Sequence, residues 1–480
     1  MPNGAMMATN GTIDKPREAC GVVGIWGKEA SVKVAPLCYL GLYALQHRGQ
    51  ESAGMVTFDG KQLWLSKGAG LVPEVFDLDS LAELPGFAGI GHVRLATQAE
   101  KHVINTQPLL VRSSYGSLAI AQNGSIVNGK ELRQELLDRG TVLQTDTDSE
   151  VILNLIAQSG EADLPSAVAK ILSRVRGAYA LVVLGEGMLL AARDPWGNRP
   201  LCLGRLEEGY VVASESCAIA NLGGELLREV QPGELLILDH AGYHTHSLDP
   251  GKKQALCAFE HVYFARPDSS IGGRNAYLVR KAIGRELAQE ALVTADVVIG
   301  APDSGMSPAL GFAEAAKLPF EIGVIKNRYV GRTFLQPTPA GRKLAVRIKL
   351  NPVIEVLKGK SVAMIDDSIV RGTTSGKLIA LLKEAGAREV HMYVASPPYR
   401  FPCLYGIEPS SHTELVARGR TVEELKTLIG ADSLHYVSVE GLVRAIGIPK
   451  EQLCLACFTG DYPIGAPGAS IDRLSDQRRE

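Results

Sequence analysis

The chain has 480 residues, of which 46% are hydrophobic and 21% charged, and its formal net charge is −2. This is the composition of a soluble globular protein of two or three domains, and its charge balance gives no reason to expect nucleic acid or an acidic membrane surface as a partner. No apolar run reaches the roughly 18 residues of a membrane helix, and residues 1–19 lack the apolar core of a secretory signal; we therefore expect a cytoplasmic protein whose eight cysteines are catalytic, metal-binding or buried.

The first half of the chain, to about residue 250, is predicted to be strand-rich with a few helices. Residues 20–27 (CGVVGIWG) predict a strand, and Val34–Gly49 has apolar residues near helical spacing with a glycine stop. Residues 117–129 alternate in polarity and are expected to turn at Asn123-Gly124. A hairpin is expected around Gly185–Gly187, and a further strand in residues 231–239.

The second half alternates helix and strand. Helices are predicted in residues 274–292 and 308–318, a strand followed by a turn in residues 295–305, and a strand, loop, helix and strand in residues 360–396. This alternation is typical of a parallel sheet with crossover helices. The polar, Gly- and Pro-bearing stretch near residues 240–253 is the expected domain boundary, and both ends of the chain are expected to be mobile.

The segment Val362–Thr374 (VAMIDDSIVRGTT) carries the chemistry of the second half. A buried strand is followed by Asp366 and Asp367, then by a glycine and hydroxyl residues that lead into a helix. Backbone N–H groups at such a loop can hold a phosphate, and the two acids suit ribose hydroxyls or Mg²⁺. The alternative is an ordinary strand-to-helix turn whose acids cap the helix. The spacing excludes a P-loop.

The string DDSIVRGTT resembles the phosphoribosyl pyrophosphate loop of type I phosphoribosyltransferases. Together with APDSG (residues 301–305) and KNRYVGRTF (residues 326–334), it makes the chain resemble the amidophosphoribosyltransferase family, from Cys20 to about Tyr462. The resemblance implies Mg²⁺ at Ser304, Asp366 and Asp367, and a mobile lid with Lys326, Arg328 and Arg332. It implies that phosphoribosyl pyrophosphate is bound by Asp366, Asp367, Ser368, Arg371, Gly372, Thr373, Thr374, Lys326 and Arg332.

The same resemblance implies the domain plan. An α+β N-terminal nucleophile glutaminase domain, an αββα sandwich, would span residues 20–250, after a cleaved propeptide of residues 1–19. An α/β type I phosphoribosyltransferase domain with a parallel sheet would span 251–465, before a mobile tail of 466–480. Cleavage after Ala19 would make Cys20 the first residue, with its own α-amino group, of unperturbed pKa about 7.7–8.0, as the base. Taken alone, Cys20 could equally be a buried strand cysteine.

The resemblance also implies a glutamine site. Arg94 would clamp the substrate carboxylate with Thr97 beside it, Asn123 and Gly124 would form the oxyanion hole, and Asp148 would hold the substrate ammonium group. An Asn-Gly pair in an alternating segment is otherwise usually a hairpin turn. This chain has Leu95 and Ala96 where the family usually has Tyr and Ser, and Gln122 where His is common. These departures lie beside the predicted glutamine pocket and bear on glutamine affinity.

Four further cysteines form a candidate metal site. Cys454 and Cys457 form a C-x₂-C pair, which alone is shared by zinc, iron–sulfur and redox sites. The resemblance implies a [4Fe–4S] cluster on Cys257, Cys403, Cys454 and Cys457, in preference to a structural zinc ion. The remaining cysteines, Cys38, Cys202 and Cys217, are predicted to lie in the core.

The function expected from the resemblance is glutamine-dependent conversion of phosphoribosyl pyrophosphate to 5-phosphoribosylamine, the first committed step of purine synthesis. Purine nucleotide inhibitors and a homo-dimer or homo-tetramer are expected as well. Two alternatives stay open. One is another glutamine-dependent transferase, although the phosphoribosyl loop makes this reading less favourable. The other is a phosphoribosyl pyrophosphate sensor that has lost catalysis.

Overall fold

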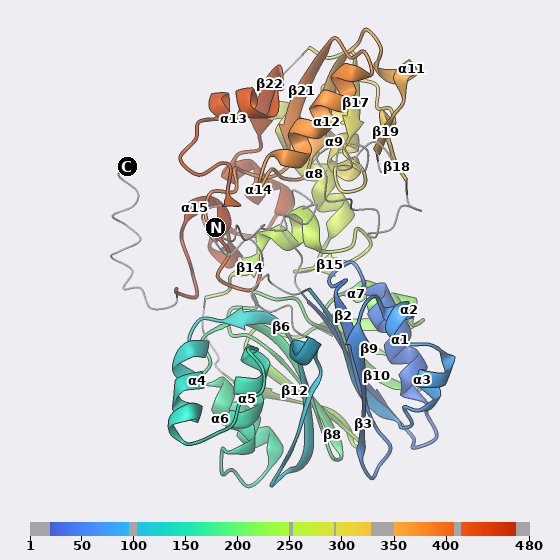
Figure 1. The fold of residues 1–480 in the computed structure, drawn as a ribbon, viewed down its shortest axis with the longest axis vertical. Coiled ribbons are helices and arrows are strands. Elements are labelled where there is room, and N and C mark those ends of the chain that lie inside the picture. The colour runs from blue at the N-terminus through green and yellow to red at the C-terminus, as the bar shows by residue number, and fades with distance from the viewer. Residues whose placement is uncertain are drawn as a thin grey trace, which may run out of the picture.

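The computed structural model describes residues 20–95, 103–248, 253–291, 294–327, 350–407 and 414–466. Two antiparallel sheets form the first domain (Figure 1). The first sheet has the order β11 (Glu225–Glu229), β9 (Cys202–Arg205), β10 (Gly209–Ala213), β1 (Gly21–Gly27), β4 (Ala88–Arg94), β2 (Ser52–Phe58) and β3 (Leu63–Ala69). The second has the order β13 (Gly242–Ser247), β12 (Glu234–Asp239), β8 (Met188–Arg193), β7 (Gly177–Gly185), β6 (Gly116–Ile126) and β5 (Leu109–Ser113).

The two sheets pack face to face, and helices cover their outer faces. Side chains of both sheets, among them Trp26, Ile90 and Val182, share one buried cluster. The first sheet is covered by α1 (Val34–Ala44), α2 (Val72–Val75), α3 (Leu78–Ala82) and α7 (Ser216–Asn221). The second is covered by α4 (Gly129–Asp138), α5 (Asp148–Ala157) and α6 (Leu164–Leu172). The predicted αββα sandwich is therefore confirmed.

The second domain is built on a parallel sheet of order β17 (Val297–Gly300), β20 (Ser361–Asp366), β21 (Glu389–Val394) and β22 (Ser433–Tyr436). Alternate residues of its strands face opposite sides, as the period of a strand requires. One side packs on α8 (Ala276–Glu290), α9 (Met306–Ala316) and α14 (Val439–Ile446), and the other on α12 (Thr373–Glu384) and α13 (Val422–Ile429). The predicted parallel-sheet domain is confirmed.

Short elements connect the two domains and lie at the periphery of the second domain. They are β14 (Leu256–Cys257), a π-helical turn at Glu260–Phe264, β15 (Ser270–Ile271), β16 (Arg274–Asn275), β18 (Val324–Lys326), β19 (Leu350–Pro352), α11 (Ile354–Leu357), β23 (Leu453–Cys454) and α15 (Ala456–Thr459). Strand β14 pairs in parallel with β23, so the start and the end of the second domain lie side by side. Within the described residues, no helix is both long and apolar enough to cross a membrane.

Two local predictions were wrong. Strand β6 runs straight through Asn123 and Gly124 and keeps its register with β7 from Ala119 to Ile126, so the expected turn is absent. Gly124 has a φ of +123°, which glycine tolerates inside a strand, and pairing on both sides holds the strand extended. The first helix ends at Ala44 rather than at Gly49: Leu45 has left helical geometry, with φ −95° and ψ 8°, and residues 45–48 form turns. The hairpin at Gly185–Gly187 is confirmed.

Candidate functional site

Cys20 lies half-buried immediately before β1, whose seven residues are all buried. The Nε–H of Arg48 donates to the carbonyl of Cys20 at 3.2 Å. The next residue, Gly21, pairs with Val93, so Cys20 lies beside the end of β4, where Arg94 is found. Gly49 approaches the same strand so closely that a Cβ there would lie 2.6 Å from the Arg94 nitrogen. The Arg48-Gly49 segment therefore fits against the nucleophile and Arg94 together.

A buried histidine ties the two sheets together next to these residues. His92, two residues before Arg94, donates from Nε2 to the carbonyl of Gln122 at 3.0 Å. Burial lowers the pKa of His92 to about 3, so its ring is neutral at physiological pH. Because Gln122 precedes Asn123, this bond holds the strand of Arg94 against the strand of the predicted oxyanion hole.

The Asn123 side chain is fully buried, and neither its Nδ2 nor its Oδ1 has a hydrogen-bond partner among the described residues. Buried amides are nearly always hydrogen-bonded, and an unpaired one costs about 1–3 kcal/mol. Gly124 cannot be replaced by a larger residue without loss, since its φ is positive and a Cβ would overlap the Ala178 carbonyl. An unpaired amide beside an obligatory glycine is the arrangement that an oxyanion hole requires.

Asp148 begins α5 and lies directly behind this strand. One of its oxygens, Oδ2, accepts from the Ile126 N–H at 2.9 Å and from Ser125 Oγ at 3.1 Å. Desolvation raises the pKa of Asp148 above its usual range, although the Ile126 N–H opposes the shift. A bound ammonium group would reverse this shift, so Asp148 suits the α-ammonium of glutamine. Thr97, the remaining predicted glutamine contact, lies outside the described residues.

In the second domain, the two predicted acids lie at the carboxyl end of β20 and are almost fully buried. Asp366 accepts from the Asp367 N–H at 2.9 Å, and Asp367 accepts from Ser368 Oγ at 2.6 Å. Gly372, with a φ of +77°, leads into α12, which begins at Thr373. The acids, the hydroxyl and the start of the helix thus face the end of the sheet where ligands of open α/β folds bind.

A second loop adjoins this one. Strand β17 is parallel to β20, with Gly300 opposite Ile365, so residues 301–305 with Ser304 lie beside Asp366. Lys326 reaches back to this loop and pairs with Asp303 at 2.7 Å. Arg371 pairs with Glu414 at 2.6 Å, so a phosphate at Arg371 would compete with that carboxylate. The predicted lid residues Arg328 and Arg332 lie outside the described residues.

The four candidate cluster cysteines line one cavity. Cys257 of β14 lies opposite Cys454 of β23, Cys457 follows in α15, and Cys403 accepts from the Tyr405 N–H through its sulfur at 3.4 Å. All four are unbridged, and burial raises the pKa of Cys257 to about 12 and that of Cys454 above its usual range. Among the described residues, no group of three or more His, Cys, Asp or Glu side chains is placed to hold one metal ion. Four thiols around one cavity are a donor set that both a structural zinc ion and an iron–sulfur cluster can use.

A buried charge network beside Cys20 was missed by the sequence analysis. Arg48 is 1% exposed, and its guanidinium bonds Glu215 at 2.6 Å and Glu260 at 2.7 and 3.0 Å. Burial alone would lower the pKa of Arg48, but these two carboxylates raise it above its usual range. Arg48 lies in the string LQHRGQESAG (residues 45–54), and Glu260 stands with His261 in a stretch that is otherwise mostly apolar (residues 255–264, ALCAFEHVYF). A charged residue within an apolar run was the available signal.

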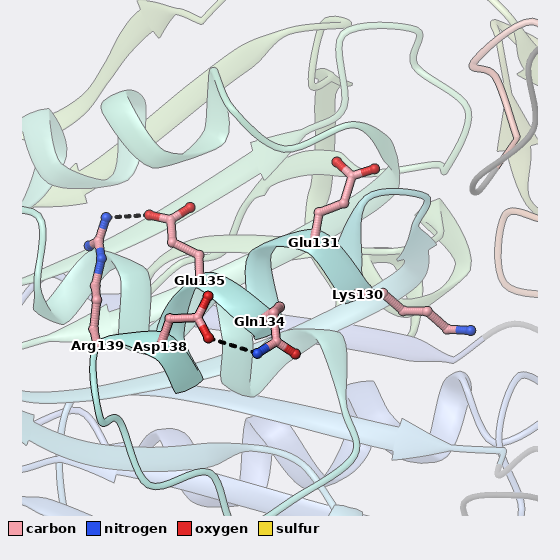
Figure 2. A pocket seen from close by; sticks show the side chains of 6 residues that line it. All are labelled: Lys130, Glu131, Gln134, Glu135, Asp138 and Arg139. Atoms are coloured by element: carbon pink, nitrogen blue, oxygen red, sulfur yellow. Dashed lines mark hydrogen bonds and ion pairs between the residues drawn. The ribbon is translucent and has the colours of Figure 1, made fainter.

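The shallow pocket on α4 is not a candidate site. It is lined by Lys130, Glu131, Gln134, Glu135, Asp138 and Arg139 (Figure 2). Arg139 pairs with Glu135, and Gln134 donates to Asp138 at 2.8 Å, so these side chains interact along one exposed helix. None of the predicted catalytic residues lines it.

Comparison with known proteins identifies the family. A glutamine amidotransferase domain model matches residues 92–221. The amidophosphoribosyltransferase of Bacillus subtilis is 49% identical over 451 residues, which cover 93% of this chain and 94% of the relative. The chain belongs to the amidophosphoribosyltransferase family. The family enzyme of Methanocaldococcus jannaschii is 47% identical over 92% of this chain and 97% of its own length.

Solved structures of the family agree with the fold described above. One, described as the allosteric regulatory enzyme of purine biosynthesis, superposes with a TM-score of 0.90 at 47% identity and covers 94% of this chain and 98% of its own. Another, the glutamine phosphoribosylpyrophosphate amidotransferase of B. subtilis in complex with ADP and GMP, gives a TM-score of 0.89 at 48% identity, covering 94% of this chain and 99% of its own. The similarity therefore extends over both domains.

Proposed function

We propose that this member of the amidophosphoribosyltransferase family carries out its reaction at two sites, one in each domain. The chain transfers the amide nitrogen of glutamine to phosphoribosyl pyrophosphate and yields 5-phosphoribosylamine, glutamate and pyrophosphate, the first step of purine biosynthesis. The observation that carries the site assignment is the unpaired, buried Asn123 amide beside Gly124, in the same domain as Cys20.

In the first site, the Cys20 thiol attacks the side-chain carbonyl of glutamine. Once residues 1–19 are removed, the freed α-amino group of Cys20 takes the thiol proton, since its ordinary pKa of about 7.7–8.0 is near ambient pH. Asn123 Nδ2 and the Gly124 N–H stabilise the tetrahedral oxygen. Ammonia leaves with the proton, and water then hydrolyses the thioester to glutamate. Arg94 and Asp148 hold the two charged groups of the substrate, with Thr97 as a further contact.

In the second site, ammonia attacks the anomeric carbon of phosphoribosyl pyrophosphate and pyrophosphate leaves. The loop from Asp366 to Thr374 holds the ribose hydroxyls and the 5′-phosphate, with N–H groups at the start of α12 directed toward the phosphate. Lys326 and Arg332 bind the pyrophosphate. Asp366, Asp367 and Ser304 are the residues that would hold Mg²⁺, and two adjacent buried carboxylates fit that ion. Bound there, Mg²⁺ would neutralise charge on the leaving pyrophosphate.

We infer that Cys257, Cys403, Cys454 and Cys457 hold a [4Fe–4S] cluster. Their common cavity supports this, because a [4Fe–4S] cluster is held by four cysteine thiolates. The cluster would supply covalent cross-links between the start and the end of the second domain. We further propose inhibition by purine nucleotides, supported by the ADP and GMP complex of the B. subtilis relative, assembly into a dimer or tetramer, and a cytoplasmic location.

The decisive experiment measures pyrophosphate release in anaerobically prepared protein, with glutamine or ammonium as the nitrogen source. We expect release with both, and loss of only the glutamine-driven rate in Cys20→Ala. Release with ammonium alone would show that the departures at Leu95, Ala96 and Gln122 have disabled the glutaminase. Release with neither would favour the sensor. Intact-mass analysis that finds an active, full-length chain would refute cleavage after Ala19.

A further inference from the structure

Two residues of the second domain contact the glutaminase machinery of the first. The first is Glu260, in the π-helical turn that follows β14. It is fully buried, and its two carboxylate oxygens accept from both terminal nitrogens of Arg48. Since the third nitrogen of Arg48 donates to the Cys20 carbonyl, only one side chain separates Glu260 from the nucleophile.

The bidentate pair fixes the Arg48 guanidinium in a plane and orients its Nε–H. Fork-to-fork pairs of this kind are more directional than single bonds, and a buried one has no water to replace a lost partner. Glu215, which also holds Arg48, accepts from the Arg266 N–H at 2.8 Å and from Ser269 Oγ at 2.6 Å. Residues on both sides of the domain boundary therefore fix this guanidinium.

The second residue is Gly406, in the loop that follows Cys403. Its backbone approaches the oxyanion strand so closely that a Cβ would lie 2.8 Å from the carbonyl carbon of Gly124 and 3.1 Å from the Ser125 nitrogen. The loop is held by Arg199 of the first domain, whose Nε–H donates to the Tyr405 carbonyl at 3.2 Å. The second domain thus packs on the backbone that supplies the predicted oxyanion N–H.

We propose that Glu260 and Gly406 are positioning residues of the glutaminase reaction: Glu260 sets Cys20 through Arg48, and Gly406 sets Gly124 by direct packing. The inference rests on the proposed roles of Cys20 and Gly124. It means that the first domain carries all the reacting groups of the glutaminase but not all the residues that place them. Both contacts come from segments adjoining the predicted cluster cysteines, Cys257 and Cys403.

The test uses Glu260→Gln and Gly406→Ala in the two-domain protein, each processed and prepared anaerobically in the same way as the unmodified protein. The Glu260→Gln substitution keeps the size of the side chain but removes its charge. Alanine at residue 406 presses on Gly124 and is strained at the φ of +101° found there, so the Tm of each variant is measured beside its rates, and the two variants test the proposal independently. The matched control is Glu234→Gln, which removes the same charge from the bidentate pair with Arg228 and touches none of the site residues.

We expect both variants to lose as much as about 100-fold in glutamine-driven kcat, the effect of a small misplacement of reacting groups. The ammonium-driven rate should stay within about twofold, because neither variant changes a residue of the second site. The glutamine-driven kcat should fall by more than the KM for glutamine changes, because Arg94 and Asp148 themselves are kept. Alkylation of Cys20 by iodoacetamide should slow in Glu260→Gln but not in Glu234→Gln.

Equal loss of the ammonium- and glutamine-driven rates would overturn the proposal, because it would show a structural role only. Unchanged glutamine-driven rates in the two variants would overturn it as well. Failure of the proposed function can be told apart from failure of this inference. If the proposed function is wrong, the unmodified protein itself releases no pyrophosphate with glutamine.

Discussion

Replacing Asn123 by Ala should separate catalysis from stability. The amide is fully buried and has no partner among the described residues, so its removal breaks no hydrogen bond within them. The substitution has two opposite effects on the free energy of unfolding. Lost packing lowers it, and removal of an unpaired buried amide, which costs about 1–3 kcal/mol, raises it. We expect the free energy of unfolding to change by no more than about 1 kcal/mol. Loss of one oxyanion donor should lower the glutamine-driven kcat by about 10²–10³, or roughly 2.7–4 kcal/mol of barrier.

The matched control is Asn128→Ala. Asn128 is also buried, but its Nδ2 donates to the Arg174 carbonyl at 3.0 Å and its Oδ1 accepts from the Arg176 N–H at 2.9 Å. Its removal breaks two hydrogen bonds to the backbone and should lower stability by about 1–3 kcal/mol, or about 2–4 °C in Tm per kcal/mol for a domain of this size.

The assay compares pyrophosphate release with glutamine and with ammonium, alongside thermal unfolding followed by circular dichroism. Asn123→Ala should lose only the glutamine-driven rate, and Asn128→Ala only thermal stability. A large fall in the Tm of Asn123→Ala, with unchanged glutamine-driven kcat, would refute the reasoning and make Asn123 a structural residue.

The remaining predictions concern other parts of the two sites. Gly124→Ala should reduce the yield of folded protein by overlap with the Ala178 carbonyl; normal yield and Tm would contradict the strained backbone. Because the pKa of Asp148 is raised, its carboxylate is protonated at milder acidity than usual. The KM for glutamine should therefore rise as the pH falls through that range. Asp148→Asn should have a high KM for glutamine that does not change with pH over the same range. Asp367→Asn should abolish pyrophosphate release with either nitrogen source while Cys20 stays reactive to iodoacetamide; retained ammonium-driven release would remove Asp367 from the site. Cys257→Ser should lose the visible absorbance of an iron–sulfur cluster and unfold at a lower temperature, and an unchanged spectrum would refute the cluster assignment.

The sequence predicted the architecture better than its details. The strand, loop and helix from Val362 onward were predictable because a buried strand and an amphipathic helix have distinct periods. The turn at Asn123-Gly124 was wrong, since local turn chemistry gives no information on the two neighbouring strands that keep β6 extended. The candidate glutamine residues came from a family resemblance, as spacing alone does not bring residues 94, 123 and 148 together.

The pairing of Arg48 with Glu260 was not predictable from pattern, although Glu260 itself stands out as a charged residue in a mostly apolar run. Its partners are 212 residues apart in the sequence, and each would be expected at the surface from its type. Only the tertiary structure shows that both are buried and that the pair joins the nucleophile to the second domain. Pairs of this kind depend on how two domains dock, which leaves no periodic trace in either segment.

The parallel pairing of β14 with β23 has a consequence for synthesis of the chain. Leu256 cannot acquire its partner Leu453 until almost the whole polypeptide has left the ribosome, because β23 lies near the carboxyl end. Contacts so distant in sequence form late, after a large loop has closed. The segment that carries Glu260 directly follows β14. A chain that ends before residue 453 therefore contains Glu260 but lacks the strand on which β14 pairs, so this connection between the domains is completed only at the end of translation.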